Sequence, residues 1–230
     1  MITKKSKRTG RFCSISRKTS ETDISLSLNL DGKGKYSIDS GIPFFNHMLE
    51  QFSKHSRFDM TIKAKGDVEV DIHHLIEDTG IVIGAAMKES SGDKIGIRRF
   101  GGASVPMDEA LVNTSVDFSG RPFFVFNYGS KDMLASPYPG QFSGVLKKYG
   151  SLNNKNALRE IFVDKFFGVY LSIFFDSLCK NALMTLHINI AYGTNAHHMV
   201  EAAFKSAAMA ISGALTLTGS KELPSTKGRI

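Results

Sequence analysis

Apolar and polar residues alternate along several short segments of the chain, which is the pattern of a half-buried β-strand. In residues 22–30 the apolar positions are Ile24, Leu26, Leu28 and Leu30, and the residues between them are polar. Similar short patterns predict strands at 58–64, 110–118, 123–128 and 184–191, a shorter strand at 36–38 and an extended piece at 68–72. The sequence Asp31-Gly-Lys-Gly predicts a hairpin turn that joins the first strand to 36–38.

Other segments carry apolar residues three and four positions apart, which is the spacing of an amphipathic helix. These segments are 44–55, 73–88, 158–180 and 198–215. Each half of the sequence therefore has the predicted order strand, strand, helix, strand, helix. Residues 131–157 are rich in Gly, Ser, Asn and Lys and have no counterpart in the first half, so we expect a surface loop there.

The two halves also share a motif with the pattern His-His-x-x-Glu. Its copies are His73-His74-Leu75-Ile76-Glu77 and His197-His198-Met199-Val200-Glu201, and each follows a predicted strand and opens a predicted helix. A tandem duplication is the simple explanation of this match. We therefore predict an α/β fold of the α+β type, built from two repeats at 17–92 and 93–220. A basic N-terminal tail at 1–16 and a C-terminal tail at 221–230 complete the chain.

Both copies of the motif have the chemistry of a metal chelate. On a helix, residues three and four positions apart share a face, so the glutamate of each motif lies beside one of its histidines. The other histidine points roughly 100° away and is free to bind a second ion. Imidazole and carboxylate ligands without thiolate suit Mn, Fe, Co or Zn. The alternative is that these are surface or core histidines without a ligand role.

Composition narrows the class of protein and its partners. Hydrophobic residues make up 42% and charged residues 22%, which is ordinary for a soluble domain. The longest apolar runs are shorter than the roughly 20 residues of a membrane-spanning helix. Cys13 and Cys179 match no metal or redox spacing, and the basic N-terminus has no apolar stretch, so we expect a cytoplasmic protein. The net charge of +7 suits an anionic partner, either nucleic acid or a phosphorylated metabolite.

Weaker signals mark candidate residues for an anion and for proton transfer. Arg99, Arg121, Lys205 and Lys227 can form charge-assisted hydrogen bonds with a phosphate, although each alone also fits a solvated surface charge. Leu223-Pro-Ser-Thr-Lys-Gly can cradle an anion or be a frayed tail. Glu21 and the pair Asp108-Glu109 are candidate acid/base carboxylates.

Six motifs, in their order along the chain, resemble imidazoleglycerol-phosphate dehydratase. They are Gly41-Ile-Pro-Phe-Phe-Asn-His-Met-Leu, Asp71-Ile-His-His-Leu-Ile-Glu-Asp, Pro106-Met-Asp-Glu-Ala-Leu, Ser119-Gly-Arg-Pro, Asn195-Ala-His-His-Met-Val-Glu-Ala-Ala-Phe-Lys and Leu223-Pro-Ser-Thr-Lys-Gly. The resemblance implies a manganese-dependent lyase of histidine biosynthesis that converts imidazole glycerol phosphate to imidazole acetol phosphate and water. It also implies two ribosomal-S5-domain-2-like repeats, with two four-stranded sheets and helices packed between them. Shells of 24 subunits, with active sites at the subunit interfaces, are implied as well. We expect no nucleic-acid or membrane partner.

The resemblance also assigns site residues. One metal would bind His47, His74, Glu77 and His197, and a second would bind His73, His198, Glu201 and one further ligand. Two Mn²⁺ ions would bind the imidazole ring, which takes up charge as the carbon proton leaves. The implied catalytic residues are Glu21, as acid/base, together with His47, His73, Glu77, His197 and Glu201. The substrate and its phosphate would be bound by Glu21, His55, Arg99, Arg121, Lys205, Ser225, Thr226 and Lys227.

One departure from the family pattern concerns the second metal. Family members often place a histidine or glutamate before a Phe-Phe pair, and this chain has Ile173 before Phe174-Phe175 or Lys165 before Phe166-Phe167. Neither Ile173 nor a protonated Lys165 can bind a metal ion. We therefore expect unequal metal sites. The alternative to an active dehydratase is a catalytically weak paralogue that keeps the shell and one metal and serves in assembly or binding.

Overall fold

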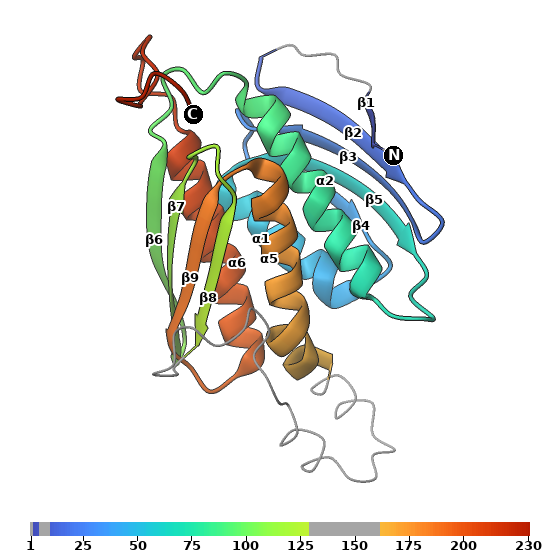
Figure 1. Cartoon of the computed structure of the whole chain (residues 1–230). Coiled ribbons are helices and arrows are strands. Elements are labelled where there is room, and N and C mark those ends of the chain that lie inside the picture. Colours follow the sequence, from blue (N-terminus) through green and yellow to red (C-terminus); the bar gives the residue numbers. More distant parts are fainter. Residues whose placement is uncertain (1, 5–9, 129–161) are drawn as a thin grey trace, which may run out of the picture.

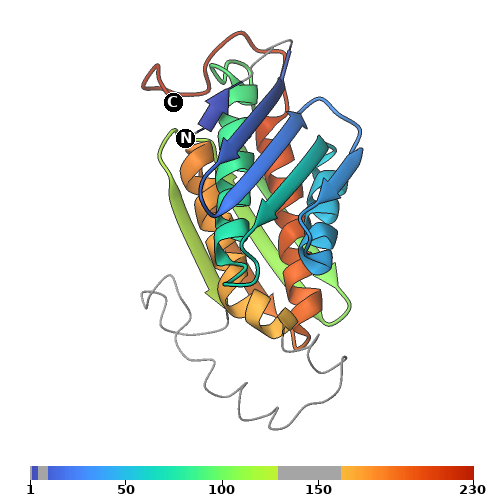
Figure 2. The same cartoon turned by 90° about the vertical axis from the view of Figure 1, so that its right-hand side faces the viewer.

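The computed structural model describes residues 2–4, 10–128 and 162–230, so the predicted surface loop at 131–157 lies outside the described residues. Two β-sheets form the outer layers of the molecule, and the helices lie between them (Figure 1). A quarter turn about the vertical axis brings the sheet of the first half to the front, with the helices behind it (Figure 2). The predicted class, with two sheets enclosing helices, is confirmed.

The elements follow the duplicated plan. The first half contains β1 (Ile2–Lys4), β2 (Phe12–Lys18), β3 (Thr22–Asn29), β4 (Tyr36–Asp39), α1 (Pro43–Ser56), β5 (Asp59–Gly66) and α2 (His73–Ser91). The second contains β6 (Phe100–Met107), β7 (Ala110–Asp117), β8 (Phe123–Tyr128), the π-helix η2 (Phe166–Tyr170), α5 (Leu171–Ala182), β9 (Thr185–Tyr192) and α6 (Ala196–Leu215). The strand orders are β1-β2-β3-β5-β4 and β6-β7-β9-β8. Apart from β1, the two sheets therefore share one topology, as a tandem duplication requires.

The structure contains strands that the sequence did not predict: β1 and β2 in the first half, and β6 in the second. The first sheet therefore has five strands, not the four that were expected. Strand β2 begins at Phe12, inside the segment expected to be a tail, and buries Cys13 and Ile15 against the helices. Strand β6 alternates between half-buried and exposed positions but includes Gly101 and Gly102. Because so few large apolar residues mark these strands, their pattern is too weak to detect in the sequence. Apart from β1 and the π turn η2, the observed order in each half is three strands, a helix, a strand and a helix.

The predicted hairpin between β3 and β4 is wrong. Strand β5 pairs antiparallel with β3 and parallel with β4, so it lies between them. The turn after β3 is instead bound to the start of β5. Asp59 Oδ1 accepts hydrogen bonds from the backbone N–H groups of Lys33 and Lys35, each at 2.8 Å. The extended piece expected at 68–72 is also wrong: it is a turn, in which the Val70 N–H donates to the Asp67 carbonyl at 2.8 Å.

The core consists of the apolar faces of the helices and the inner faces of both sheets. Helix α2 packs on α5 and helix α1 packs on α6, so the two halves meet through their helices. The described part of the predicted apolar helix at 158–180 is helical from residue 162, with the single π turn η2 leading into α5. Within the described ranges, no helix combines the length and hydropathy needed to cross a bilayer.

Helices α2 and α5 pack closely because α2 has glycine at two of the contact positions, Gly80 and Gly84. A Cβ atom at Gly84 would lie 2.3 Å from the Leu178 carbonyl oxygen and 2.9 Å from Asn181 Cβ. We expect Gly84→Ala to lower the free energy of unfolding by about 1–3 kcal/mol, because the helices must move apart.

Gly213, in helix α6, is the matched control for Gly84. A Cβ atom there meets nothing within 4 Å, so Gly213→Ala should raise stability by about 0.5–1 kcal/mol through its helix propensity. Denaturant unfolding of both variants tests the prediction, and a stabilised Gly84→Ala protein would contradict it.

Candidate metal and active site

Both His-His-x-x-Glu motifs stand at the first turn of a helix, and a polar residue fixes each helix start. Before α6, the Asn195 side chain accepts the backbone N–H groups of His197 at 2.9 Å and His198 at 3.4 Å. Before α2, Asp71 Oδ1 accepts the backbone N–H of His73 at 3.1 Å. Both helices begin at the lower end of the molecule in Figure 1.

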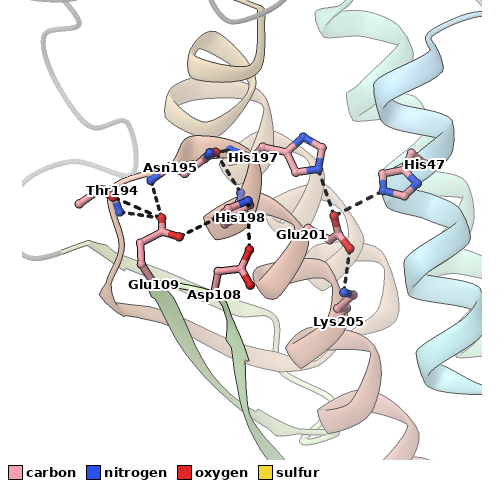
Figure 3. Close-up of polar contacts among 9 residues, drawn as sticks. All are labelled: His47, Asp108, Glu109, Thr194, Asn195, His197, His198, Glu201 and Lys205. Carbon is pink, nitrogen blue, oxygen red and sulfur yellow. Dashed lines mark hydrogen bonds and ion pairs between the residues drawn. The ribbon is translucent and has the colours of Figure 1, made fainter.

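His47 on α1 meets the second motif because α1 packs along α6. Glu201 Oε2 lies 3.4 Å from His47 Nε2 and 3.1 Å from His197 Nε2, as Figure 3 shows. The other carboxylate oxygen, Oε1, accepts a hydrogen bond from Lys205 Nζ at 2.7 Å. We call His47, His197 and Glu201 the His47 cluster.

Burial and a lysine set the charge of this cluster. The Glu201 side chain is 7% exposed, and burial alone would raise its pKa. The hydrogen bond and charge of Lys205, with the nearby His47, outweigh burial and leave the pKa of Glu201 below its ordinary value. His55 lies two helical turns beyond His47, and its pKa is lowered by burial and then by the charge of Lys205. The cluster therefore presents an ionised carboxylate to two imidazoles.

The donor set of the His47 cluster fits a divalent transition metal. Within residues 2–4, 10–128 and 162–230, it is the one group of three or more potential ligands whose donor atoms all lie within 4.8 Å of one another. Two imidazole nitrogens and a carboxylate oxygen suit Mn, Fe, Co or Zn. Because Lys205 occupies Oε1, the oxygen that faces both histidines remains available to an ion.

His198, the second histidine of this motif, turns away from the His47 cluster toward the turn between β6 and β7. Its Nδ1 lies 2.7 Å from Glu109 Oε2, and its Nε2 lies 3.7 Å from Asp108 Oδ2. Glu109 Oε1 also accepts hydrogen bonds from Thr194 and from the Asn195 N–H (Figure 3). The bond from His198, followed by these backbone bonds, lowers the pKa of Glu109 to about 2. Glu109 is therefore ionised at neutral pH and is a poor proton donor.

The first motif has a similar arrangement. His73 Nε2 lies 3.7 Å from Glu77 Oε2, one helical turn away. His74 Nδ1 lies 3.2 Å from both carboxylate oxygens of Asp67, which raises the pKa of His74. Glu21 Oε2 lies 4.0 Å from the same nitrogen, and the Glu21 side chain is half exposed. The first motif thus faces two carboxylates, of which only Glu21 was expected from the sequence.

The expected metal-ligand sets combine residues that this single chain holds in different places. The structure places Glu201 with His47 and His197, whereas the resemblance assigned it to the other metal with His73 and His198. Among the described residues, the first motif contributes no ligand to the His47 cluster. The two four-ligand sets remain predictions.

The residues expected to bind phosphate also lie in two separate regions of the chain. Arg99 donates to both carboxylate oxygens of Asp117, at 2.8 and 3.2 Å, and to the Pro224 carbonyl at 2.8 Å. The bond to Asp117 raises the pKa of Arg99. The backbone N–H of Arg99 donates to the Ala214 carbonyl, so Arg99 lies at the C-terminal end of α6.

Some of the other candidate phosphate residues lie near Arg99, and the rest lie near the His47 cluster. Arg121 is exposed in the turn before β8, close to where the C-terminal segment with Ser225, Thr226 and Lys227 returns to Gly120. This segment lies at the upper end of Figure 1, opposite the start of α6. His55 and Lys205 lie instead near the His47 cluster. One chain therefore supplies two separate basic groups.

Ile173, which stands where family members often have a metal ligand, is part of the core. Ile173 is 6% exposed on α5 and belongs to the main hydrophobic cluster. Lys165 is exposed, with its Nζ 5.2 Å from the centre of the Tyr170 ring. Among the described residues, neither side chain forms a hydrogen bond or ion pair with a histidine or glutamate of the two motifs.

Three comparisons with known proteins agree. A sequence model of the family described as imidazoleglycerol-phosphate dehydratase matches residues 40–148 and 146–211. The imidazoleglycerol-phosphate dehydratase of Methanosarcina mazei is 44% identical over 220 residues, covering 96% of this chain and 100% of that protein. That of Corynebacterium glutamicum is 41% identical over 221 residues, covering 96% and 98%.

Solved structures give the same result. Imidazoleglycerol-phosphate dehydratase from Staphylococcus aureus superposes with a TM-score of 0.66 and 33% identity, over 90% of this chain and 99% of that one. The Pyrococcus furiosus structure, a complex with (S)-C348, superposes with a TM-score of 0.68 and 32% identity, over 94% and 99%.

Proposed function

Because the chain belongs to the imidazoleglycerol-phosphate dehydratase family, we propose that it removes water from imidazole glycerol phosphate to give imidazole acetol phosphate in histidine biosynthesis. The observation that carries this proposal is the His47 cluster, in which residues of two family motifs, far apart in sequence, meet with a metal-binding donor set. The reaction breaks a C–H and a C–O bond on neighbouring carbons, so the site must accept a proton and release water.

We infer that the chain holds two divalent ions, with manganese as the expected metal. His47, His74, Glu77 and His197 would bind one, and His73, His198 and Glu201 the other, with ligands drawn from more than one subunit. A bound ion supplies positive charge that stabilises negative charge developing on the imidazole ring. The buried, ionised Glu201 supplies a fixed anionic oxygen, and Lys205 holds that carboxylate in place.

Glu21 is the proposed acid/base. Its carboxylate lies beside the first motif, 4.0 Å from His74 Nδ1, and its half-exposed side chain is free to reach a substrate carbon. Asp67 takes the hydrogen bond of His74, so Glu21 keeps its oxygen atoms for proton transfer.

The division of the basic residues supports a site shared between subunits. Helix α6 has 20 residues and is about 30 Å long, and Arg99 contacts its end while the histidines stand at its start. A small phosphorylated substrate cannot span that length, so Arg99, Arg121, Ser225, Thr226 and Lys227 would bind the phosphate of a substrate whose ring lies on another chain. His55 and Lys205 line the side of the site that would hold the imidazole ring.

We propose a cytoplasmic homo-oligomer, with 24 subunits as the expected number.

Turnover of imidazole glycerol phosphate by the purified, Mn²⁺-loaded protein tests the proposed function. We expect turnover that chelation abolishes and Mn²⁺ restores, together with a particle that shrinks in chelator when followed by light scattering. A particle that assembles and binds metal without turnover would identify a catalytically inactive relative instead. The metal content per chain after desalting also tests whether a site without a ligand at Ile173 loses its ion.

The phosphate assignment predicts the effect of one substitution. Arg121→Ala removes a charge-assisted hydrogen bond worth about 1.5–3 kcal/mol, so KM should rise about 10- to 100-fold with metal content unchanged. Lys18→Ala is the control, because Lys18 is an exposed cation whose ion pair is with exposed Asp23. Unchanged KM in the Arg121 variant would place the phosphate elsewhere.

A further inference from the structure

We propose that Glu109 and Asp67 are positioning residues, each of which holds Nδ1 of the second histidine of a His-His-x-x-Glu motif and thereby directs its Nε2 toward the metal. This inference rests on the proposed function, because it concerns the metal that the dehydratase uses. Neither residue belongs to the ligand sets or to the substrate contacts described above.

Glu109 holds His198 with a short and well-supported bond. An ionised carboxylate only accepts hydrogen bonds, so the 2.7 Å contact requires the proton of the neutral His198 ring to sit on Nδ1. The lone pair is then on Nε2, the nitrogen that would bind an ion. Asp108 Oδ2 lies 3.7 Å from Nε2, beyond hydrogen-bond distance. Glu109 itself is fixed because its other oxygen accepts the backbone N–H groups of Thr194 at 3.2 Å and Asn195 at 2.7 Å.

Asp67 does the same for His74 in the first half. Both Asp67 oxygens lie 3.2 Å from His74 Nδ1, and Asp67 follows β5 immediately, so its backbone is fixed by the sheet. The backbone N–H of Asp67 donates to the Glu21 carbonyl at 3.1 Å, which ties it to the turn between β2 and β3. His74 therefore also presents Nε2.

The first histidine of each motif is oriented differently. His73 and His197 turn Nε2 toward the glutamate one helical turn later, at 3.7 Å from Glu77 and 3.1 Å from Glu201. Adjacent histidines point roughly 100° apart on a helix, so one carboxylate cannot orient both. Each motif therefore needs a second carboxylate from outside the helix.

The duplicated topology shows where that carboxylate comes from. Glu109 lies in the turn between β6 and β7, which corresponds to the turn between β2 and β3 that carries Glu21. Both glutamates face the second histidine of their own half, Glu109 at 2.7 Å and Glu21 at 4.0 Å. In the second half the glutamate of this turn holds the histidine. In the first half Asp67 holds it, which leaves Glu21 for the proposed proton transfer.

Mn²⁺ titration of the full-length protein, with free Mn²⁺ followed by electron paramagnetic resonance, tests the proposal. Glu109→Gln and Asp67→Asn keep side-chain size but remove the charge, and each should weaken one Mn²⁺ site about 10- to 100-fold. Glu222→Gln and Asp23→Asn are the matched controls and should bind Mn²⁺ like the unmodified protein. Normal thermal unfolding of the metal-free variants would separate positioning from a folding defect.

The ring tautomer gives a second readout that does not depend on turnover. Solid-state NMR of ¹⁵N-histidine-labelled, metal-free protein should show Nδ1-protonated rings, and Glu109→Gln should change the signal of one of them. Unchanged Mn²⁺ affinity in both variants, or Nε2-protonated rings at His74 and His198, would overturn the proposal. A protein with the expected tautomers and affinities but no turnover would contradict the proposed function and leave this inference intact.

Discussion

Replacing Glu201 by glutamine is expected to lower Mn²⁺ affinity and turnover at limiting Mn²⁺ by at least about 100-fold. Loss of a residue that merely orients a ligand already costs about 10- to 100-fold, and Glu201 faces both His47 and His197 directly. Glutamine keeps the size of the side chain but removes its charge. Lys205, only 20% exposed, then loses its partner and leaves a positive charge beside the two imidazoles. Isothermal titration with Mn²⁺ and steady-state turnover measure the two effects.

Glu222→Gln is the control for the loss of one carboxylate charge, because Glu222 is exposed in the C-terminal segment. It should leave Mn²⁺ affinity unchanged. If Glu201→Gln bound Mn²⁺ and turned over normally, Glu201 would be only the buried partner of Lys205, and the His47 cluster would not be a metal site.

The second large effect is expected in the core. Phe204 on α6 is fully buried, stacks on Phe174 at 5.2 Å between ring centres, and lies 5.0 Å from Phe175. Phe204→Ala should lower the free energy of unfolding by about 3–5 kcal/mol, because it removes these contacts and leaves a cavity between the halves. For a chain of this length, that corresponds to a fall of about 6–20 °C in the unfolding midpoint.

Met209→Ala provides the comparison on the same helix. Met209 is 46% exposed, so its truncation should change stability far less. Scanning calorimetry of both variants under the same metal concentration measures the difference. Equal midpoints for the two would show that the phenylalanine cluster does not hold the helix layers together.

The sequence predicted the helices better than the strands. Helices 44–55, 73–88 and 198–215 were recovered because their apolar residues repeat over three or more turns. Strand β6 was missed because it has glycine where helix α6 approaches most closely: a Cβ at Gly101 would lie 2.0 Å from the Ala210 carbonyl oxygen. That constraint comes from a helix in a distant part of the chain, and no local pattern records it.

The wrong hairpin has a similar cause. Turn residues at 31–34 specify that the chain reverses but not which strand it will pair with. The pairing is decided by β5, which is placed between β3 and β4 after α1 has crossed the sheet. Local turn chemistry cannot anticipate such an insertion.

The candidate site was predictable where residues share a helix. The spacing in His-His-x-x-Glu predicted the contact of His197 with Glu201 and of His73 with Glu77, and both are present. His47 entered through the family resemblance, because its approach to α6 depends on helix packing. Asp67 was missed, because it lies outside the motif and reaches His74 only through the turn after β5.

The packing of α1 on α6 and of α2 on α5 bears on the origin of the chain. One half alone would leave the outer face of its two helices bare, and that face is apolar. A protein with a single half would therefore need a second copy to cover it, so the present chain corresponds to a homodimer fused into one polypeptide. Fusion frees the two copies to diverge, because a substitution in one half is no longer repeated in the other. On one side Glu21 and Asp67 both face Nδ1 of His74, whereas on the other Glu109 faces Nδ1 and Asp108 faces Nε2 of His198, and a symmetric dimer cannot encode such an asymmetry.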